Sequence, residues 1–275
     1  MSATEHMTPA MWAGTLYEIA LVVWGACLVW PLALSPSARA APRRLHAWNI
    51  LPIDFACYLC FAFVGAMAVS AVSGLVLKHA GLTADQAMVV GGAVMHAGIL
   101  LGLVAFFQTV GKRANPMGPA TSFVSDLRSG LATFLVLMPV VAGTNVVWEY
   151  VITKLGLPDD KQDMVDILQK SHSSGLILLL VAVATLLVPV TEELVFRAGI
   201  FRFARTRMPR WAAVLMTSVI FGALHMSWSS FAPLSVLSAV FCLAYERTGS
   251  IRTTMVAHAL FNLNTFIIIM AGLGQ

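Results

Sequence analysis

The sequence has few charged residues and no long polar segment. Only 11% of its 275 residues are charged and 59% are hydrophobic, whereas a soluble globular domain has about 25% charged and about 45–50% apolar residues. A membrane-spanning helix needs about 20 consecutive apolar residues, and this chain has several such runs. The composition therefore excludes a disordered chain and a water-soluble domain, and it predicts an all-α, polytopic membrane protein.

Cysteine is also scarce. The four cysteines, Cys27, Cys57, Cys60 and Cys242, all fall inside apolar stretches. A disulfide framework is therefore not expected, and the C-x-x-C spacing lacks the context of a redox or zinc site. The H-E-x-x-H pattern of zinc peptidases is absent as well. We expect the cysteines to be packed membrane residues.

The apolar runs predict eight membrane spans. The sixth and seventh are short, so we expect them to be tilted, bent or partly buried in protein. The predicted spans cover residues 14–34, 51–77, 88–110, 131–152, 175–197, 211–225, 231–245 and 255–270. The first of them is expected to be retained rather than cleaved as a signal peptide, because residues 1–13 contain no Lys or Arg.

Basic residues are concentrated in alternate loops. Thirteen of the 17 Lys and Arg residues follow the odd-numbered spans. Positively charged loops stay in the cytoplasm, so this asymmetry predicts that both termini lie outside. Membrane orientation thus accounts for the net charge of +4, and no nucleic-acid partner is expected. Single polar residues within spans, such as His96, are expected to be interfacial or hydrogen-bonded.

Two adjacent carboxylates stand at the end of the fifth apolar run. Glu192 and Glu193 follow Pro189, and Arg197 comes four residues after Glu193. On a helix Glu193 and Arg197 share a face and can pair, whereas Glu192 points about 100° away and is free to act. A central membrane charge costs roughly 2.5–3.5 kcal/mol, so the pattern indicates a polar site. The alternative is an acidic pair that anchors the helix end at the interface.

Two histidine motifs follow in the later spans. Phe221 and His225 are four residues apart, and Gly222 between them allows another helix to approach closely. His258 and Asn262 have the same spacing. An imidazole and a carboxamide one turn apart can donate two hydrogen bonds toward one point, which suits an oxyanion. Ordinary interhelical hydrogen bonding is the alternative for this second pair.

Taken together, the three clusters predict acyl transfer to water. Water held by Glu192 and His225 is the candidate nucleophile. His258 and Asn262 are then placed to hold the oxyanion of an attacked carbonyl group. Such a site needs neither a serine nor a cysteine nucleophile.

The motifs resemble those of the CPBP intramembrane proteases. That family includes the type II CAAX prenyl endopeptidases and the bacterial Abi proteins linked to bacteriocin self-immunity. The patterns E-E-x-x-x-R, F-x-x-x-H and H-x-x-x-N stand here at Glu192, Glu193, Arg197, Phe221, His225, His258 and Asn262. The flanking segments 196–199 and 245–250 are also similar to the family, and the resemblance covers about residues 130–270.

This resemblance implies a bundle of about eight helices around an intramembrane catalytic cavity, with residues 1–130 holding helices one to three and residues 131–275 the protease core. It implies hydrolysis of a peptide bond by an activated water. The implied roles are Glu192 as general base, His225 as its partner in orienting water, His258 and Asn262 as the oxyanion hole, and Glu193, Arg197 and Phe221 as supporting residues.

The metal requirement of such a site is a separate question, since the family is often described as metalloproteases and a glutamate-dependent mechanism without tight zinc is also proposed for it. Zinc prefers three protein ligands and one open position. If a divalent metal such as zinc binds here, Glu192, His225 and His258 are its expected ligands. We expect no obligatory metal.

The expected partners are the lipid bilayer and a membrane-associated peptide or protein, with CAAX-like and lipidated peptides among the candidate substrates. The expected location in a bacterium is the plasma (inner) membrane. A non-catalytic immunity or scaffold protein on the same fold is the main alternative function. A proton- or ion-coupled transporter is a third, but the sequence lacks the internal repeat typical of that class.

Overall fold

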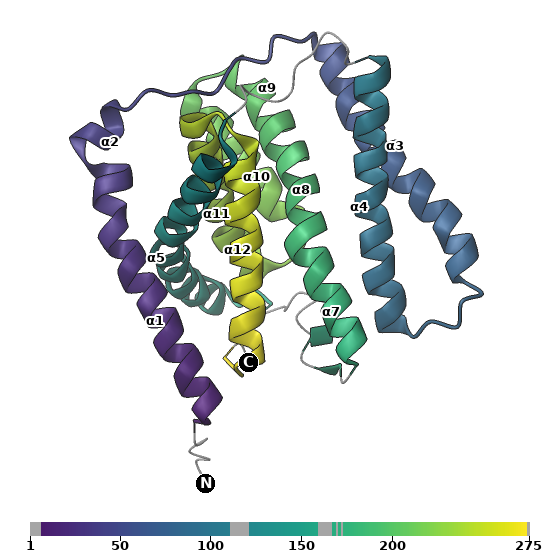
Figure 1. The fold of residues 1–275 in the computed structure, drawn as a ribbon, viewed down its shortest axis with the longest axis horizontal. Helices are drawn as coiled ribbons and strands as arrows, with labels where there is room; N and C mark the ends of the chain where they lie inside the picture. Colours follow the sequence, from purple (N-terminus) through teal and green to yellow (C-terminus); the bar gives the residue numbers. More distant parts are fainter. Residues whose placement is uncertain (1–6, 111–120, 159–166, 169, 172, 274–275) are drawn as a thin grey trace.

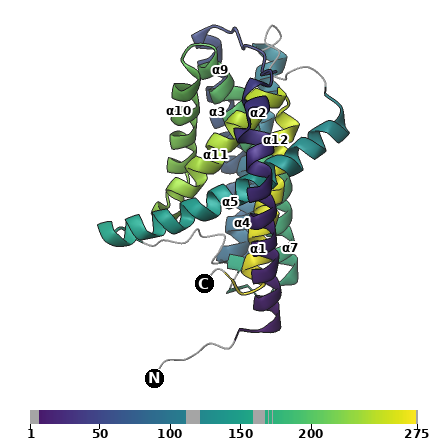
Figure 2. The same ribbon diagram turned by 90° about the vertical axis from the view of Figure 1, so that its left-hand side faces the viewer.

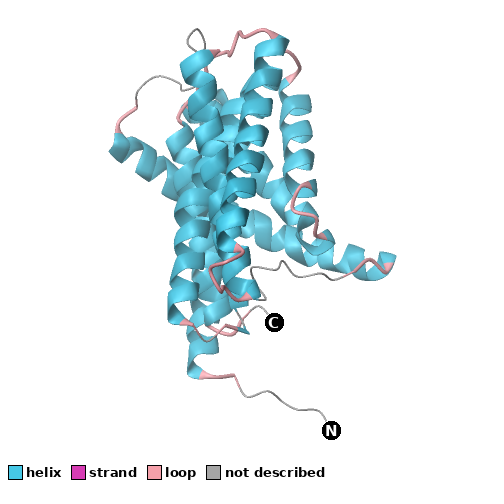
Figure 3. Cartoon of the chain, turned by 90° about the vertical axis from the view of Figure 1, so that its right-hand side faces the viewer, coloured by secondary structure: helices cyan, strands magenta, loops and turns pink. Residues whose placement is uncertain are grey.

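The protein is a bundle of apolar helices, and the described part of the chain contains no strand (Figures 1 and 3). The computed structural model describes residues 7–110, 121–158, 167–168, 170–171 and 173–273. The first half contains α1 (Pro9–Val29), the π-helical segment η1 (Trp30–Leu34), α2 (Pro36–Ala40), α3 (Pro52–Leu77), α4 (Ala84–Thr109) and α5 (Phe123–Leu155). The second half contains α7 (Ser174–Ala182), η3 (Val183–Leu187), α8 (Val188–Glu192), η4 (Glu193–Phe201), α9 (Arg202–Arg205), α10 (Arg210–Ala223), α11 (Trp228–Thr248) and α12 (Ile251–Met270).

Seven helices in the described residues are long and apolar enough to cross a membrane. The sixth predicted span corresponds to α10, which has only 14 residues, as its short apolar run indicated. The expectation of an all-α, multi-pass membrane protein is confirmed. Gly222 of α10 also has the expected role: a Cβ atom there would lie 2.6 Å from the Phe231 carbonyl oxygen of α11, so only glycine permits this approach.

The seventh span is longer than predicted. The sequence indicated a short span over 231–245, but α11 has 21 residues. Ser227 caps its first turn by accepting a hydrogen bond from the Ser230 amide. At the other end the helix continues past the apolar run to Gly249, which has a φ of 70°. The extension includes Glu246, whose charge is neutralised by arginines from other segments, so the polar turn can be buried.

The fourth span is also longer than predicted. Its apolar run suggested 131–152, yet α5 has 33 residues and ends at Gly156 in the left-handed conformation. Figure 2 shows α5 crossing the bundle obliquely, which is how a helix longer than the hydrocarbon thickness is accommodated. The extra N-terminal turn contains Asp126, whose carboxylate pairs with Arg252 Nε at 2.7 Å.

The fifth span, Ser174–Arg205, is one unbroken helix that contains two π-helical segments. The first, η3, directly precedes the turn that contains Pro189, and the second, η4, begins at Glu193. Single-turn π-helical distortions inside α-helices occur frequently at functional sites. The carboxylate pair therefore lies on the part of the span where the regular helical ladder is altered.

The described basic segments next to α2, α9 and the start of α12 gather at one end of the bundle, and α1 begins and α12 ends at the other (Figure 1). Lys112 and Arg113, in the basic loop that follows the third span, lie outside the described residues. The segment between α2 and α3 lies across this basic end. Its backbone amides of Arg44 and Leu45 donate to the Glu246 carbonyl oxygen at 3.0 and 3.1 Å. Arg247 in turn donates to the Ala38 carbonyl oxygen at 2.9 Å. The segregation of charge predicted from the sequence is thus present in the fold.

A cavity of about 430 Å³ lies between α3 and α4. Ser70 and Gly74 of α3 line it, together with Gly91 and Val94 of α4. None of the motif residues borders this cavity. The catalytic cavity implied by the family resemblance therefore stays a prediction.

Candidate active site

The two adjacent glutamates stand at the junction between α8 and η4. Glu192 ends α8 and Glu193 begins η4, so their side chains leave the helix in different directions. The Glu193 side chain has no exposed surface, whereas that of Glu192 is 18% exposed. Glu192 Oε2 is buried and has no hydrogen-bond partner among the described residues. Glu193 Oε2 likewise has no hydrogen-bond partner among the described residues, so accessibility is what distinguishes the two carboxylates.

Glu193 and Arg197 form the predicted ion pair. Arg197 Nη1 lies 2.9 Å from Glu193 Oε1, and neither side chain has exposed surface. The guanidinium carbon lies 4.6 Å from the ring centre of Phe221 and 5.2 Å from that of Phe241. Two aromatic faces therefore surround the cation, an arrangement that favours positive charge. The pairing lets both charges be buried beside the more exposed Glu192.

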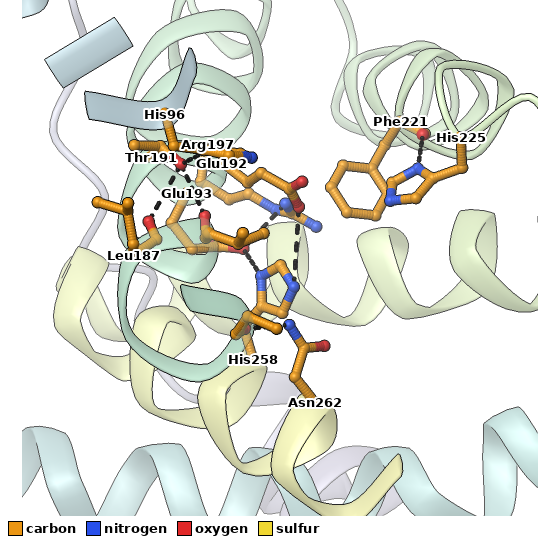
Figure 4. A network of polar contacts seen from close by, with 12 residues as sticks. His96, Leu187, Thr191, Glu192, Glu193, Arg197, Phe221, His225, His258 and Asn262 are labelled. Atoms are coloured by element: carbon orange, nitrogen blue, oxygen red, sulfur yellow. Dashed lines mark hydrogen bonds and ion pairs between the residues drawn. The ribbon is translucent and has the colours of Figure 1, made fainter. Parts of the chain in front are cut away.

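His258 links α12 to both glutamates. Its Nδ1 atom lies 3.0 Å from Glu193 Oε1, and its Nε2 atom lies 3.7 Å from Glu192 Oε2. The first distance is a hydrogen bond, in which the carboxylate accepts and Nδ1–H donates. The second exceeds hydrogen-bond length. Figure 4 shows the ring held between the two carboxylates, so one nitrogen is fixed on Glu193 and the other faces Glu192.

Asn262 lies one turn after His258 on α12, as the spacing predicted. Its Nδ2 atom donates to the Ala184 carbonyl oxygen of η3 at 2.7 Å. Altered π-helical turns leave carbonyl groups that neighbouring side chains can satisfy. One amide hydrogen of Asn262 is therefore engaged with the fifth span, and the second remains available as a donor.

His225 lies in a turn beyond the end of α10, not on the helix as the sequence suggested. The helix ends at Ala223, and Met226 has a φ of 52°. The ring folds back so that Nδ1 contacts the Phe221 carbonyl oxygen at 2.8 Å. Because a carbonyl oxygen only accepts, Nδ1 carries the hydrogen and the Nε2 atom of the neutral ring keeps a lone pair. In Figure 4 a dashed line joins His225 to Phe221 alone.

The conditional metal ligands do not form a metal site in this arrangement. Among the described residues, no group of three or more His, Cys, Asp or Glu side chains is placed to hold a metal ion. The Nδ1 atoms of His225 and His258 are already bonded, to Phe221 and Glu193 respectively. The set of Glu192, His225 and His258 does not fit a zinc ion as placed, and we derive no step through a metal.

Three residues in or next to the glutamate segment, Thr191, His96 and Tyr58, were not assigned to the site from the sequence. Thr191 precedes Glu192 and has no exposed surface. Its hydroxyl lies 2.6 Å from His96 Nδ1 of α4, which confirms that His96 is hydrogen-bonded. Tyr58 of α3 donates its hydroxyl hydrogen to the Leu194 carbonyl oxygen at 2.7 Å. The only sequence signal for these contacts was the presence of single polar side chains within apolar runs.

Comparison with known proteins supports the family resemblance. Residues 174–264 match the family model described as type II CAAX prenyl endopeptidase Rce1-like. The chain is also 26% identical over 174 residues to a Bacillus subtilis (strain 168) protein named "Putative membrane peptidase YdiL", a match that covers 62% of this chain and 67% of that protein. No solved structure matches the chain.

The matched segment runs from α7 into α12 and contains every residue of the three motifs. It supports a CAAX-type intramembrane protease at the level of the family. Together with the seven apolar helices, it describes an integral, multi-pass membrane protein. The resemblance inferred from the three motifs is thus supported over residues 174–264, the segment that matches the model of the Rce1-like type II CAAX prenyl endopeptidases.

Proposed function

We propose that the protein is an intramembrane endopeptidase that hydrolyses a peptide bond of a membrane-associated substrate with a water molecule activated by Glu192. The observation that carries this proposal is the unequal pair of glutamates. Glu193 is paired with Arg197 in full burial, while the Glu192 side chain is 18% exposed. One carboxylate is thus structural and the other is free to take a proton.

In the proposed reaction Glu192 is the general base. The water oxygen attacks the carbonyl carbon of the peptide bond while Glu192 accepts a proton from the water. The tetrahedral intermediate then collapses, the carbon–nitrogen bond breaks, and the leaving amine receives that proton. General acid–base catalysis of this kind contributes about 10²–10⁴-fold to a rate.

His258 and Asn262 are the proposed oxyanion donors. Because His258 Nδ1–H is bonded to Glu193, the ring donates through Nε2 only when both nitrogens carry hydrogen. As an oxyanion donor, His258 must therefore carry hydrogen on both nitrogens, and this is part of the proposal. Asn262 contributes the amide hydrogen that is not used by Ala184.

His225 is the proposed partner of Glu192 in orienting the water. Its Nδ1–H is fixed on the Phe221 carbonyl oxygen, so Nε2 presents a lone pair that can accept a hydrogen bond from the water. The Phe221 ring supports His225, with 4.8 Å between the ring centres. Phe221 thus serves both His225 and Arg197, which accounts for an aromatic residue in this motif.

The proposed substrate class is a peptide at the membrane surface, and CAAX-like or lipidated peptides are the first to be examined. We also propose that the basic end of the bundle faces the cytoplasm and that both termini face outside. The site would then act on substrates presented within the membrane at the level of the fifth span. An obligatory metal is not part of the proposal.

The test is hydrolysis of a quenched fluorescent peptide library, including prenylated members, by the purified full-length protein in detergent. Glu192→Gln and His225→Ala are expected to lose at least about 100-fold in rate while remaining folded. Glu149→Gln is the matched control, because Glu149 is an exposed carboxylate on α5 and should leave the rate unchanged. A chelator is expected to have no effect. Full activity of Glu192→Gln would overturn the proposal and favour a non-catalytic scaffold.

A further inference from the structure

Two side chains from the N-terminal helices reach the glutamate segment, one on each side of the carboxylate pair. His96 of α4 contacts Thr191, the residue before Glu192, at 2.6 Å. Tyr58 of α3 donates to the carbonyl oxygen of Leu194, the residue after Glu193, at 2.7 Å. Both side chains lie outside the segment that matches the protease family.

The direction of the His96 hydrogen bond follows from the partners of Thr191. The Thr191 hydroxyl oxygen also lies 3.1 Å from the Leu187 carbonyl oxygen and 2.9 Å from that of Val188. Both carbonyl oxygens can only accept, and the hydroxyl has one hydrogen to donate. When Thr191 donates to its own helix, His96 donates Nδ1–H to Thr191, and the proposal takes this direction. Figure 4 shows this chain of contacts beside the two glutamates.

The Tyr58 hydrogen bond is held by tight packing. Tyr58 is 1% exposed. Its ring lies edge-on to those of Trp48 and Phe106, with 5.3 Å between the ring centres in each pair. A Cβ atom on Gly199 would lie 2.6 Å from Tyr58 Cε1. Glycine at this position is therefore what allows the ring to reach the backbone of η4. The carbonyl that Tyr58 satisfies belongs to a π-helical turn, where backbone groups need partners from other elements.

We propose that Tyr58 and His96 are positioning residues that fix the helical turn bearing Glu192 and Glu193. Each bonds to the catalytic span within two residues of a glutamate, so together they set the position and rotation of that turn relative to α3 and α4. This inference rests on the proposed function in one respect. The position of Glu192 affects the rate of peptide hydrolysis only if Glu192 activates the water.

Isosteric variants separate the two ring nitrogens of His96. An asparagine amide occupies approximately the position of Nδ1, and a glutamine amide approximately that of Nε2. If His96 acts through Nδ1–H, His96→Asn retains the bond to Thr191 and His96→Gln loses it. We expect His96→Gln and Tyr58→Phe to lower kcat by about 10–100-fold with KM nearly unchanged, since small misplacements of catalytic groups have effects of this order.

His96→Asn is expected to stay within about threefold of the wild-type kcat, because it keeps the hydrogen bond to Thr191 and so does not misplace the glutamate turn. His79→Ala and Tyr150→Phe are the matched controls, because both side chains are exposed and distant from the motifs in sequence. They should leave kcat unchanged. Rescue by glutamine but not by asparagine would overturn the assignment to Nδ1.

A second measurement requires no substrate. Hydrogen–deuterium exchange of the full-length protein in detergent reports local opening of the backbone. Peptides that cover residues 188–201 should exchange several-fold faster in Tyr58→Phe and His96→Gln than in wild type, with peptides from α12 unchanged. Unchanged exchange in 188–201 would overturn the positioning role. Faster exchange combined with full activity of Glu192→Gln would retain the positioning role and reject the proposed reaction.

Discussion

Arg197 lies 2.9 Å from Glu193, and neither side chain has any exposed surface. The two residues are four positions apart in a π-helical segment, and two phenylalanine rings enclose the cation. His258 of α12 shares the same Glu193 oxygen. The pair is therefore part of the packing of four helices, the fifth span, α10, α11 and α12, and its loss affects the fold as well as the site.

Glu193→Gln should destabilise the protein, because it leaves the Arg197 charge buried without a counter-charge. Breaking a buried pair by removing one partner costs about 3–5 kcal/mol. Unfolding in mixed detergent micelles measures the change. The double variant Glu193→Gln/Arg197→Met should lose less than the sum of the two single variants, because it leaves no uncompensated charge. Strictly additive losses would contradict the coupling.

Asn262→Ala should lower both stability and kcat. The Ala184 carbonyl oxygen would lose its 2.7 Å donor, and an unsatisfied buried acceptor costs about 1–3 kcal/mol. Removal of an oxyanion donor lowers kcat by about 10²–10³-fold. Thermal unfolding and the fluorescent peptide assay report the two effects separately. A fall in stability with unchanged kcat would assign Asn262 to the fold alone.

Glu246→Gln should destabilise the protein more than Asp126→Asn. Glu246 is 2% exposed and binds Arg205 and Arg210 at 2.7 and 2.6 Å, and hydrogen bonds to charged groups contribute about 1.5–3 kcal/mol each. Asp126 is also buried but pairs with a single arginine, Arg252, whose side chain is 45% exposed, so Asp126→Asn removes fewer charged contacts. Equal unfolding temperatures for the two variants would show that Glu246 does not hold the basic end together.

The orientation can be tested with cysteines placed at opposite ends of the bundle. The starting protein should have its four native cysteines replaced by alanine. In intact cells, Lys154→Cys should react with a membrane-impermeant thiol reagent added outside, and Arg207→Cys should react only after the membrane is opened. Both positions are exposed. The reverse pattern would place the basic end outside and refute the orientation inferred from charge.

The sequence predicted most of the helices because each apolar run is long enough to be recognised alone. It also predicted the Glu193–Arg197 pair, since both residues lie on one helix and their spacing places them together. It underestimated α5 and α11, whose ends contain Asp126 and Glu246. Those polar turns are helical because arginines from other segments pair with them, and no local pattern contains that information.

The contacts between helices were less predictable. His258 was assigned by spacing to act with Asn262, but spacing within α12 does not indicate that its Nδ1 atom meets Glu193. Nor does it indicate that Tyr58 and His96 meet the fifth span. Such contacts depend on how far one helix is shifted along another, and the two π-helical segments alter that register. A pattern based on 3.6 residues per turn cannot anticipate either effect.

The placement of His258 and Asn262 on α12 has a consequence for the order of assembly. During synthesis the fifth span enters the membrane before α12 has been made, so at that stage Arg197 is the partner available to Glu193 within the span. The Ala184 carbonyl oxygen and the second contact of Glu193 gain their partners only when α12 is present. A nascent chain thus carries the proposed base before the proposed oxyanion donors, and we expect activity only after α12 has docked.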